Sequence, residues 1–464
     1  MTVSEFFLEL SQNKYLSTSD NHMYAALAVR ADGVDGATVR PAAEVLVVDC
    51  SSSMDWPPTK IANARRAAAA AVDALPDGTW FALVEGTGRA TMRFPDTPRL
   101  VQADEHTRRH AQAAARHLIA QGATAMSTWL TAARTLLDQH PDAVRHALLL
   151  TDGRNESESA ERLHTVLDAC EGQFTCDARG IGDDWEPAEL ERIAGVLRGT
   201  ADAVLEDHDL PEEFRRLIRR ATDKAIPDVR LRIVLPAFTR VAVIRQVVPS
   251  EIDLTDRVVA VQRGMVEVST GAWGEETREY HLSLAVDLAG RPHYQDLQLG
   301  RVELVPPDDS VTVPGPIPVL GHVTEDDRLS TRIDENVLRH TVQADLGRHI
   351  KAGWIRFGED DRAGAEAEWR EAVRLATRLG NEEILRRLGR LVDIDGEQVT
   401  LKEGIRPRDG FSAVLSLASS TTSGRPVTPA VTNGKPRTCP NCPALSPPGA
   451  RFCQNCRYDF EAAP

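Results

Sequence analysis

The first half of the chain alternates between buried-strand and helical patterns of apolar residues. Residues 45–48 are four consecutive apolar residues between Glu44 and Asp49, which is the pattern of a short strand buried on both faces. The Ala-rich segment 59–75 follows and has the composition of a helix. Because strands and helices continue to alternate in this way, we predict a doubly wound, Rossmann-like α/β domain with a parallel sheet over residues 44–225.

The pattern then changes to short strands. Residues 226–312 contain short alternating runs of apolar and polar residues between Pro, Gly and Asp, which indicate a small antiparallel β-sandwich. An extended segment near residues 23–30 precedes the α/β domain, and a lone strand of this kind is unstable in water. We therefore expect residues 1–43 to join the sandwich, with the α/β domain inserted in it.

The C-terminal third predicts three further parts. Residues 335–394 carry apolar positions at helical spacing, with Gly358 and Gly380 as stops, and predict a helical bundle. Residues 404–437 lose this periodicity and fill with Ser, Thr, Pro and Gly, so we expect a flexible linker. Residues 438–460 contain two C-x-x-C pairs and predict a zinc ribbon.

The two C-x-x-C pairs, separated by ten residues, supply four thiolates for a tetrahedral site. Such a sulfur set selects Zn²⁺ and needs no open coordination position, so its role is structural. The predicted zinc ligands are Cys439, Cys442, Cys453 and Cys456. The segment resembles the short ribbons at the ends of bacterial proteins, in which Gly usually follows each pair. Here Pro443 and Arg457 stand at those positions, which bears on the geometry of the knuckles and not on the ligands.

Composition and charge argue against some classes of binding partner and indicate the cellular compartment. A formal charge of −15 over 464 residues argues against nonspecific binding to nucleic acid and against an anionic membrane surface. No apolar run approaches the roughly twenty residues that span a bilayer, and the amino terminus lacks the pattern of a secretory signal. Four of the seven cysteines lie in the C-x-x-C pairs, which is metal-binding usage. We expect a soluble, cytoplasmic protein, and the resemblance of its ribbon implies that it is bacterial.

Oxygen-bearing side chains follow two of the predicted buried strands. Asp49, Ser51 and Ser53 form a D-x-S-x-S motif directly after residues 45–48, a hard-oxygen set suited to Mg²⁺ or Mn²⁺. The same residue types also cap helices, so this motif alone is ambiguous. Thr124 lies in a glycine-led loop before a predicted helix, and Asp152 follows a second apolar run. Ligands of such sheets bind beyond the carboxyl ends of the strands, where both aspartates fall.

In order and spacing, D-x-S-x-S, then Thr124, then T-D-G at 151–153 resemble the metal-ion-dependent adhesion site (MIDAS) of the von Willebrand factor A (VWA) family. The resemblance implies that Ser51 and Ser53 ligate the metal directly and that Thr124 binds directly or through water. It also implies that the two aspartates, Asp49 and Asp152, mostly hold ligand waters. A metal held in this way keeps an open position for the carboxylate of another protein. A metal-free fold that keeps the same signature is the alternative.

The sequence favours a binding protein over an enzyme, because it contains no G-x-S-x-G, phosphate-loop or H-E-x-x-H motif. Our first hypothesis is an adaptor that captures an Asp or Glu of a partner protein, with the zinc ribbon as a tethered second contact. By analogy such proteins serve bacterial signalling or chaperone-like assemblies. The alternative is nucleic-acid association through the ribbon and the VWA surface, although Arg437, Arg451 and Arg457 near Asp459 and Glu461 form only a weak basic footprint.

Overall fold

The computed structural model divides the chain into two compact units, Met1–Thr421 and Thr422–Pro464. The structure describes residues 4–33, 41–155, 157–206, 208–224, 226, 228–309, 311–330, 334–396, 398–415, 437–438 and 445–446. Among these described residues, no helix is both long enough and apolar enough to cross a lipid bilayer.

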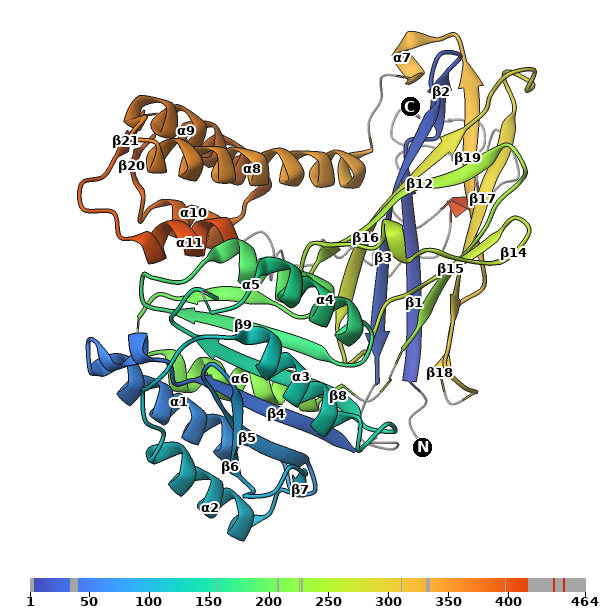
Figure 1. Cartoon of the computed structure of the whole chain (residues 1–464). Coiled ribbons are helices and arrows are strands. Elements are labelled where there is room, and N and C mark those ends of the chain that lie inside the picture. Colours follow the sequence, from blue (N-terminus) through green and yellow to red (C-terminus); the bar gives the residue numbers. More distant parts are fainter. Residues whose placement is uncertain are drawn as a thin grey trace. The chain divides into compact units, whose positions relative to one another are not determined.

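The α/β domain is built on a sheet in which strand β4 lies in the middle (Figure 1). The strand order is β10-β9-β8-β4-β5-β6, and β7 also pairs with β5. The strands are β4 (Ala42–Asp49), β5 (Trp80–Gly86), β6 (Ala90–Phe94), β7 (Val101–Gln102), β8 (Val144–Thr151), β9 (Thr175–Ile181) and β10 (Ala201–Val204). The first five neighbours in that order run parallel, whereas β6 and β7 are antiparallel to β5. The predicted Rossmann-like α/β fold is therefore confirmed.

Helices cover both faces of this sheet (Figure 1). The helices α1 (Thr59–Ala74), α2 (Glu105–Arg116) and α6 (Leu210–Thr222) pack on one face, and α3 (Met126–Leu137), α4 (Ala160–Cys170) and α5 (Pro187–Val196) on the other. Leu46 and Val48 of β4 belong to the first core, and Val45 and Val47 to the second. Successive residues of a strand point to opposite faces, so four apolar residues in a row serve two cores.

Two six-stranded sheets share one hydrophobic core and form what we call the two-sheet domain. Their orders are β13-β12-β16-β3-β1-β18 and β14-β15-β11-β17-β19-β2. The strands before the α/β domain are β1 (Ser4–Gln12), β2 (Tyr15–Ser17) and β3 (His22–Asp32). The strands after it are β11 (Arg230–Val234), β12 (Thr239–Val248), β13 (Ile252–Asp253), β14 (Val259–Gln262), β15 (Met265–Ser269), β16 (Thr277–Val286), β17 (Asp296–Val305), β18 (Val311–Thr312) and β19 (Ile317–Thr324).

Strand β3 joins residues that are far apart in the sequence. It pairs antiparallel with β16 from Thr277 opposite Arg30 to Ala285 opposite His22, and β1 pairs with β3 on its other side. Most ladders are antiparallel, but β1 with β18 and β2 with β19 are parallel. Strands continue to β19, past the boundary that we expected at residue 312, because β19 pairs antiparallel with β17 and extends its sheet.

The helical part corrects one sequence expectation. It contains α7 (Asp327–Ser330), α8 (Glu335–Gly358), α9 (Arg362–Leu379), α10 (Glu382–Leu388), a hairpin of β20 (Val392–Asp395) and β21 (Gln398–Leu401), and α11 (Pro407–Leu415). Helix α11 lies inside segment 404–437, which we expected to be a linker. Its Gly410 and Ser412 interrupt the apolar period, yet Phe411 packs on Trp185 of the α/β domain and on Trp354 of α8, with ring centroids 4.7 and 5.6 Å apart. The rest of the predicted linker, residues 416–436, lies outside the described residues.

Ion pairs fasten the helical part to one end of the α/β domain. Arg387 of α10 binds both oxygens of Asp202 in β10, at 2.6 and 2.8 Å. Arg408 of α11 binds Asp183, in the loop after β9, at 2.9 Å. The loop that carries Asp183 and its neighbour Asp184 is thus held by a helix from the far end of the unit.

In the C-terminal unit, β22 (Arg437–Thr438) pairs antiparallel with β23 (Leu445–Ser446). The predicted zinc ligands Cys439, Cys442, Cys453 and Cys456 lie outside the described residues.

Candidate metal centre

Asp49 ends strand β4 and is fully buried. Its Oδ1 accepts a hydrogen bond from the backbone N–H of Ser51 (2.8 Å), and its Oδ2 accepts one from Oγ1 of Thr151 at the end of β8 (2.6 Å). Burial raises the pKa of Asp49 to about 6, although the hydrogen bonds from Thr151 and Ser51 oppose this shift. Both oxygens are therefore fixed in direction, at the carboxyl ends of two neighbouring strands.

The two predicted serine ligands lie side by side on the loop that leaves β4. The 3₁₀ turn η1 (Ser52–Asp55) bends the chain so that Ser51 Oγ lies 2.9 Å from Ser53 Oγ. Ser53 Oγ donates a hydrogen bond to Asp152 Oδ1 (2.7 Å), and Asp152 is fully buried. The alternating positions of the motif thus bring two hydroxyls and one carboxylate together across two loops.

Thr124 reaches the same region from a third loop. The backbone N–H of Ser52 donates to the carbonyl of Gly122 (2.8 Å), which ties this loop to the D-x-S-x-S loop. Helix α3 begins just after Thr124, and its Met126 N–H donates to Oδ1 of Asn155 (2.9 Å) in the loop after β8. Three loops at one edge of the sheet are therefore bonded to one another around the site.

Gly153 shows where the oxygens converge. A Cβ atom placed on Gly153 would lie 3.2 Å from Ser53 Oγ, 3.4 Å from Thr124 Oγ1 and 3.9 Å from Asp49 Oδ2. These three oxygens therefore face one small space, which the absence of a side chain at Gly153 leaves open. Oxygen donors around a space of this size fit a small hard cation such as Mg²⁺ or Mn²⁺.

The donor set is mixed, with two carboxylates and three hydroxyls. Within the described ranges, no group of three or more His, Cys, Asp and Glu side chains is arranged to hold a metal. Of the predicted residues, Asp49, Ser51, Ser53, Thr124 and Asp152 all lie in one cluster. Two ionised carboxylates would balance the two charges of a divalent cation there, whereas the three hydroxyls would bind it as neutral ligands.

Lys60 is a component of this site that the sequence analysis missed. Its Nζ donates to Asp152 Oδ2 (2.7 Å) and to Asp184 Oδ2 (3.1 Å), and its side chain is 8% exposed. Burial lowers the pKa of Lys60, but the bonds and charges of the two carboxylates raise it overall. The sequence shows only a lysine at the start of the Ala-rich helix, which does not reveal that the side chain is buried. Asp152 is thus shared between the Ser53 hydroxyl and an ammonium group.

Two large apolar side chains are exposed on the loops that form the site. Trp56 directly follows η1 and is 78% exposed, and Ile119 is 56% exposed on the loop between α2 and α3. Single exposed apolar residues are common on protein surfaces. Here, however, both belong to the two loops that the Ser52–Gly122 hydrogen bond joins.

Several known proteins are similar to this chain in sequence and in fold. A family model described as von Willebrand factor type A domain matches residues 43–203. A solved structure, the von Willebrand factor type A protein from Catenulispora acidiphila, is 34% identical with a TM-score of 0.82, and the match covers 90% of this chain and 97% of that one. This chain belongs to the von Willebrand factor type A family. The VWA assignment predicted from the order of the motifs is confirmed, and the similarity to the Catenulispora protein extends well beyond the matched α/β domain.

More distant relatives of this VWA protein support the fold. The ArnB paralog VWA2 from Sulfolobus acidocaldarius is 14% identical, with a TM-score of 0.52 over 89% of this chain and 97% of that one. An uncharacterized protein from Synechocystis is 28% identical over 263 residues, which are 55% of this chain and 59% of that protein. The chain therefore spans about three fifths of the length of that relative.

Proposed function

We propose that this VWA protein is a non-enzymatic adaptor that captures a carboxylate of a partner protein through a divalent cation, Mg²⁺ or Mn²⁺. The cation would be held by Asp49, Ser51, Ser53, Thr124 and Asp152. The supporting observation is the convergence of Ser53, Thr124 and Asp49 oxygens on the space beside Gly153. When bound, the cation would act as an electrophile. Neutral hydroxyl ligands would leave part of its positive charge unbalanced. An acidic side chain is the natural occupant of such a position.

The exposed apolar side chains beside the site indicate which residues the partner should carry next to its carboxylate. Interface residues that contribute most to binding are often large aromatic side chains near the centre of a contact. Trp56, 78% exposed beside the metal loop, is suited to that role, and Ile119 offers a second apolar contact. We therefore expect the partner segment to carry an Asp or Glu close to an apolar residue.

The hydrogen bonds of the site favour binding over catalysis. Nucleophilic catalysis by serine needs an adjacent general base. Ser53 instead donates to Asp152, whose second oxygen is paired with Lys60. The buried His146 lies near the amino end of β8, whereas the serines lie beyond the carboxyl ends of the strands. The contacts of Ser53 are therefore those of a binding site and do not pair this serine with a histidine as general base.

The C-terminal segment completes the proposal. Zn²⁺ bound by Cys439, Cys442, Cys453 and Cys456 would hold a small ribbon, and the residues before it would act as a tether. A tethered second contact raises the effective concentration of a partner at the first. We propose that the protein works in this way in the cytoplasm, in a bacterial signalling or chaperone-like assembly.

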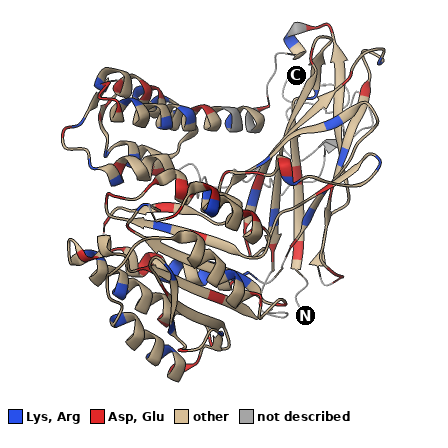
Figure 2. Ribbon diagram, in the orientation of Figure 1, with Lys and Arg blue, Asp and Glu red and all other residues tan. Residues whose placement is uncertain are grey.

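The charge distribution gives little reason to prefer nucleic acid as a partner. Figure 2 shows Lys and Arg interspersed with Asp and Glu along the described helices and strands. Nonspecific nucleic-acid binding relies on such clustered positive charge.

Calorimetric titration with Mn²⁺ tests the proposal, with Ser53→Ala and Ser52→Ala as a matched pair. Both variants remove one exposed hydroxyl from η1, but only Ser53 belongs to the oxygen cluster. We expect Ser53→Ala to weaken Mn²⁺ binding by at least about tenfold and Ser52→Ala to leave it unchanged. Equal affinities of the two variants, or no Mn²⁺ uptake by the unmodified protein, would refute the metal site.

The carboxylate step has its own test. Peptides with Asp or Asn at the same position beside an apolar residue are compared for binding to the Mn²⁺-loaded protein. The proposal requires binding of an Asp peptide that is lost with chelator, with Asn in place of Asp, and in Asp49→Ala. Binding that survives chelation and is insensitive to Asp49 would point to a different surface.

A further inference from the structure

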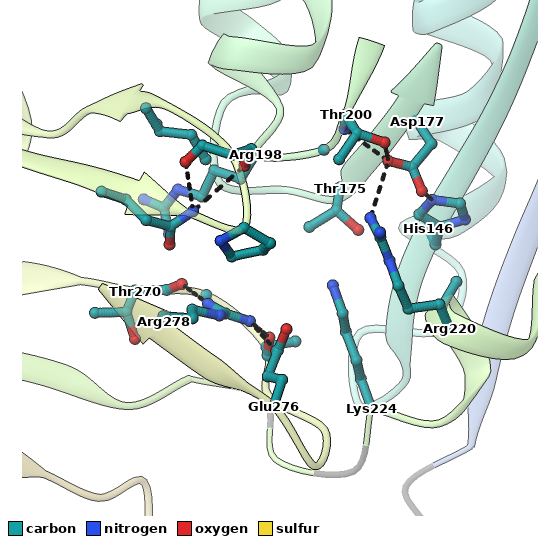
Figure 3. A pocket seen from close by; sticks show the side chains of 18 residues that line it. His146, Thr175, Asp177, Arg198, Thr200, Arg220, Lys224, Thr270, Glu276 and Arg278 are labelled. Carbon is teal, nitrogen blue, oxygen red and sulfur yellow. Dashed lines mark hydrogen bonds and ion pairs between the residues drawn. The ribbon is translucent and has the colours of Figure 1, made fainter. Parts of the chain in front are cut away.

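A small cavity lies where the α/β domain meets the two-sheet domain. It is beside the amino ends of the parallel strands, whereas the candidate metal centre is at their carboxyl ends. Its volume is about 40 Å³. The α/β domain contributes residues at the starts of β8 and β9, before β10, and at and just after the end of α6. The two-sheet domain contributes residues from β12 to β13, from the segment between β15 and β16, and from the start of β16. Figure 3 shows Arg198, Arg220, Lys224 and Arg278 extending toward this space from both domains.

The two acidic side chains that line the cavity are already satisfied. Asp177 Oδ1 accepts hydrogen bonds from the N–H and the hydroxyl of Thr200, both at 2.6 Å, and its Oδ2 lies 3.2 Å from Nε2 of His146. Glu276 is paired with Arg278, which also donates to backbone carbonyls. These two carboxylates face four lining cations, so the cavity keeps an excess of positive charge.

Lys224 and Arg198 carry this excess. Within the described part of the chain, Lys224 makes no ion pair, and burial lowers its pKa despite the charge of Glu276. Arg198 donates from Nη1 to Ser269 Oγ (2.6 Å), but its Nε is buried without a hydrogen-bond partner among the described residues. Lys224 is half-buried, whereas Arg198 Nε is buried, and a buried donor without a partner is costly. A ligand that accepts from Arg198 Nε and balances the charge of Lys224 is therefore favoured.

The backbone holds Arg198 in an uncommon conformation. Its φ is 54°, in the left-handed region that non-glycine residues seldom adopt. The next residue must be glycine, since a Cβ on Gly199 would lie 1.9 Å from the carbonyl oxygen of Cys176. Strained residues of this kind persist where the surroundings fix them, often at ligand sites. Arg198 is one of the residues that line the cavity.

We propose that this cavity binds a small oxyanion of the phosphate class, held by Lys224 Nζ and Arg198 Nε. The volume admits one tetrahedral ion or a single terminal phosphate group, and it excludes a nucleotide. Arg220 is available as a third contact, because it lies 3.8 Å from Asp177 and its bond there is loose. These three contacts come from the α/β domain, and residues of the two-sheet domain line the opposite wall.

Titration calorimetry of the full chain with inorganic phosphate, at ionic strength held constant with chloride, tests this site. We expect saturable binding at one site per chain. Lys224→Met should weaken it by about tenfold or more, the usual loss for a hydrogen bond to a charged group. Arg219→Met is the matched control, because Arg219 is exposed on α6, which ends two residues before Lys224, and its loss removes the same charge. This control should bind phosphate as the unmodified protein does.

A second variant and a structure guard against misfolding of the first. Arg198→Gln should also weaken phosphate binding, and Ser53→Ala at the metal centre should not, so this site and the proposed adaptor function fail separately. Crystals of the unmodified protein grown with phosphate should contain a tetrahedral anion at hydrogen-bond distance from Lys224 Nζ. Absence of saturable binding, equal affinity of Lys224→Met and the unmodified protein, or a cavity without the anion in such crystals would overturn the proposal.

Discussion

Lys60 Nζ lies 2.7 Å from Asp152 Oδ2, so a buried ammonium group occupies one oxygen of a predicted metal-binding aspartate. The other oxygen of Asp152 accepts a hydrogen bond from Ser53. Lys60 therefore stabilises the loops of the site without a metal, and it opposes a cation through its charge. The same lysine also contacts Asp184, whose neighbour Asp183 is held by Arg408 of α11. The helical part and the metal centre are thus linked through adjacent residues.

Removing the charge of Lys60 should tighten metal binding. A unit charge within several ångströms of the ion contributes about 1 to 4 kcal/mol, depending on solvent screening. We expect Lys60→Met to increase Mn²⁺ affinity by about tenfold and to lower the thermal stability of the metal-free protein, because Asp152 loses its buried partner. Mn²⁺ titration and thermal unfolding measure both effects. Lys14→Met, which removes a lysine paired with Asp296 in the two-sheet domain, is the control. An unchanged or weaker Mn²⁺ affinity in Lys60→Met would contradict this explanation.

Adding one methyl group at Gly153 should block the cation site. The new Cβ would lie 3.2 Å from Ser53 Oγ, in the space that the oxygens of the site share. Gly153→Ala should therefore weaken Mn²⁺ binding by at least about tenfold while changing the free energy of unfolding by less than about 1.5 kcal/mol. Gly195→Ala in α5 meets no atom within 4 Å and should retain full affinity. Normal Mn²⁺ binding by Gly153→Ala would place the ion elsewhere.

His146 should make stability depend on pH in the alkaline range. It lies 2.8 Å from Glu44 Oε2 and 3.2 Å from Asp177 Oδ2. Burial lowers its pKa, but these carboxylates outweigh burial and raise it to about 9. Because the pKa is higher in the folded state, this stabilisation is complete below about pH 6.5. It is lost as the pH rises through about 9.

Urea unfolding at pH 6.5 and pH 9 measures this effect, which we expect to be on the order of 2 kcal/mol. His146→Gln should unfold more easily at pH 6.5 and should lose less stability between the two values. His140→Gln, which replaces a histidine stacked on Trp80, should follow the unmodified protein. Parallel pH profiles of His146→Gln and the unmodified protein would show that His146 is not the group responsible.

Trp56 should contribute to partner binding without contributing to the fold. Because its side chain is 78% exposed, Trp56→Ala removes little internal packing. We expect Mn²⁺ affinity and the unfolding temperature to stay constant, and the affinity for an acidic partner peptide to fall by about tenfold or more, as for an aromatic hot spot. Surface plasmon resonance with the Mn²⁺-loaded protein measures the last. Tyr294→Ala, at an exposed aromatic residue of the two-sheet domain, is the control. An unaltered peptide affinity in Trp56→Ala would remove Trp56 from the interface.

Helix α11 should stabilise the α/β domain, although its sequence resembles a linker. Phe411 contacts Trp185 and Trp354, so Phe411→Ala should cost about 3 kcal/mol of unfolding free energy. Chemical denaturation measures this value. A cost below about 0.5 kcal/mol would mean that α11 does not pack on the domain in solution.

The sequence was sufficient for the α/β fold because its signals are local. The apolar run of β4 ends at Asp49, and that of β8 is followed by Thr151 and Asp152. Parallel strands bring their carboxyl ends together, which predicted that the two aspartates lie at one site. Lys60 could not be assigned in the same way. Its partners lie on loops distant in sequence, and an isolated lysine in an Ala-rich helix is usually exposed.

Contacts between domains were also beyond the sequence. The cavity around Lys224 and Arg198 depends on how the two-sheet domain meets the end of α6, and no spacing rule describes that contact. Helix α11 was missed because Gly410 and Ser412 obscure its apolar period, whereas its burial depends on aromatic residues of two other parts of the chain.

Strand β3 can complete its pairing only late in synthesis, because Arg30 pairs with Thr277, which is made much later. Strand β3 leaves the ribosome long before its neighbour β16, whereas every strand and helix of the α/β domain emerges between the two. Domains generally fold as units while the chain is made. The α/β domain is therefore complete while one edge of β3 still lacks its partner strand β16, and a chaperone that covers this unpaired edge would act during that interval.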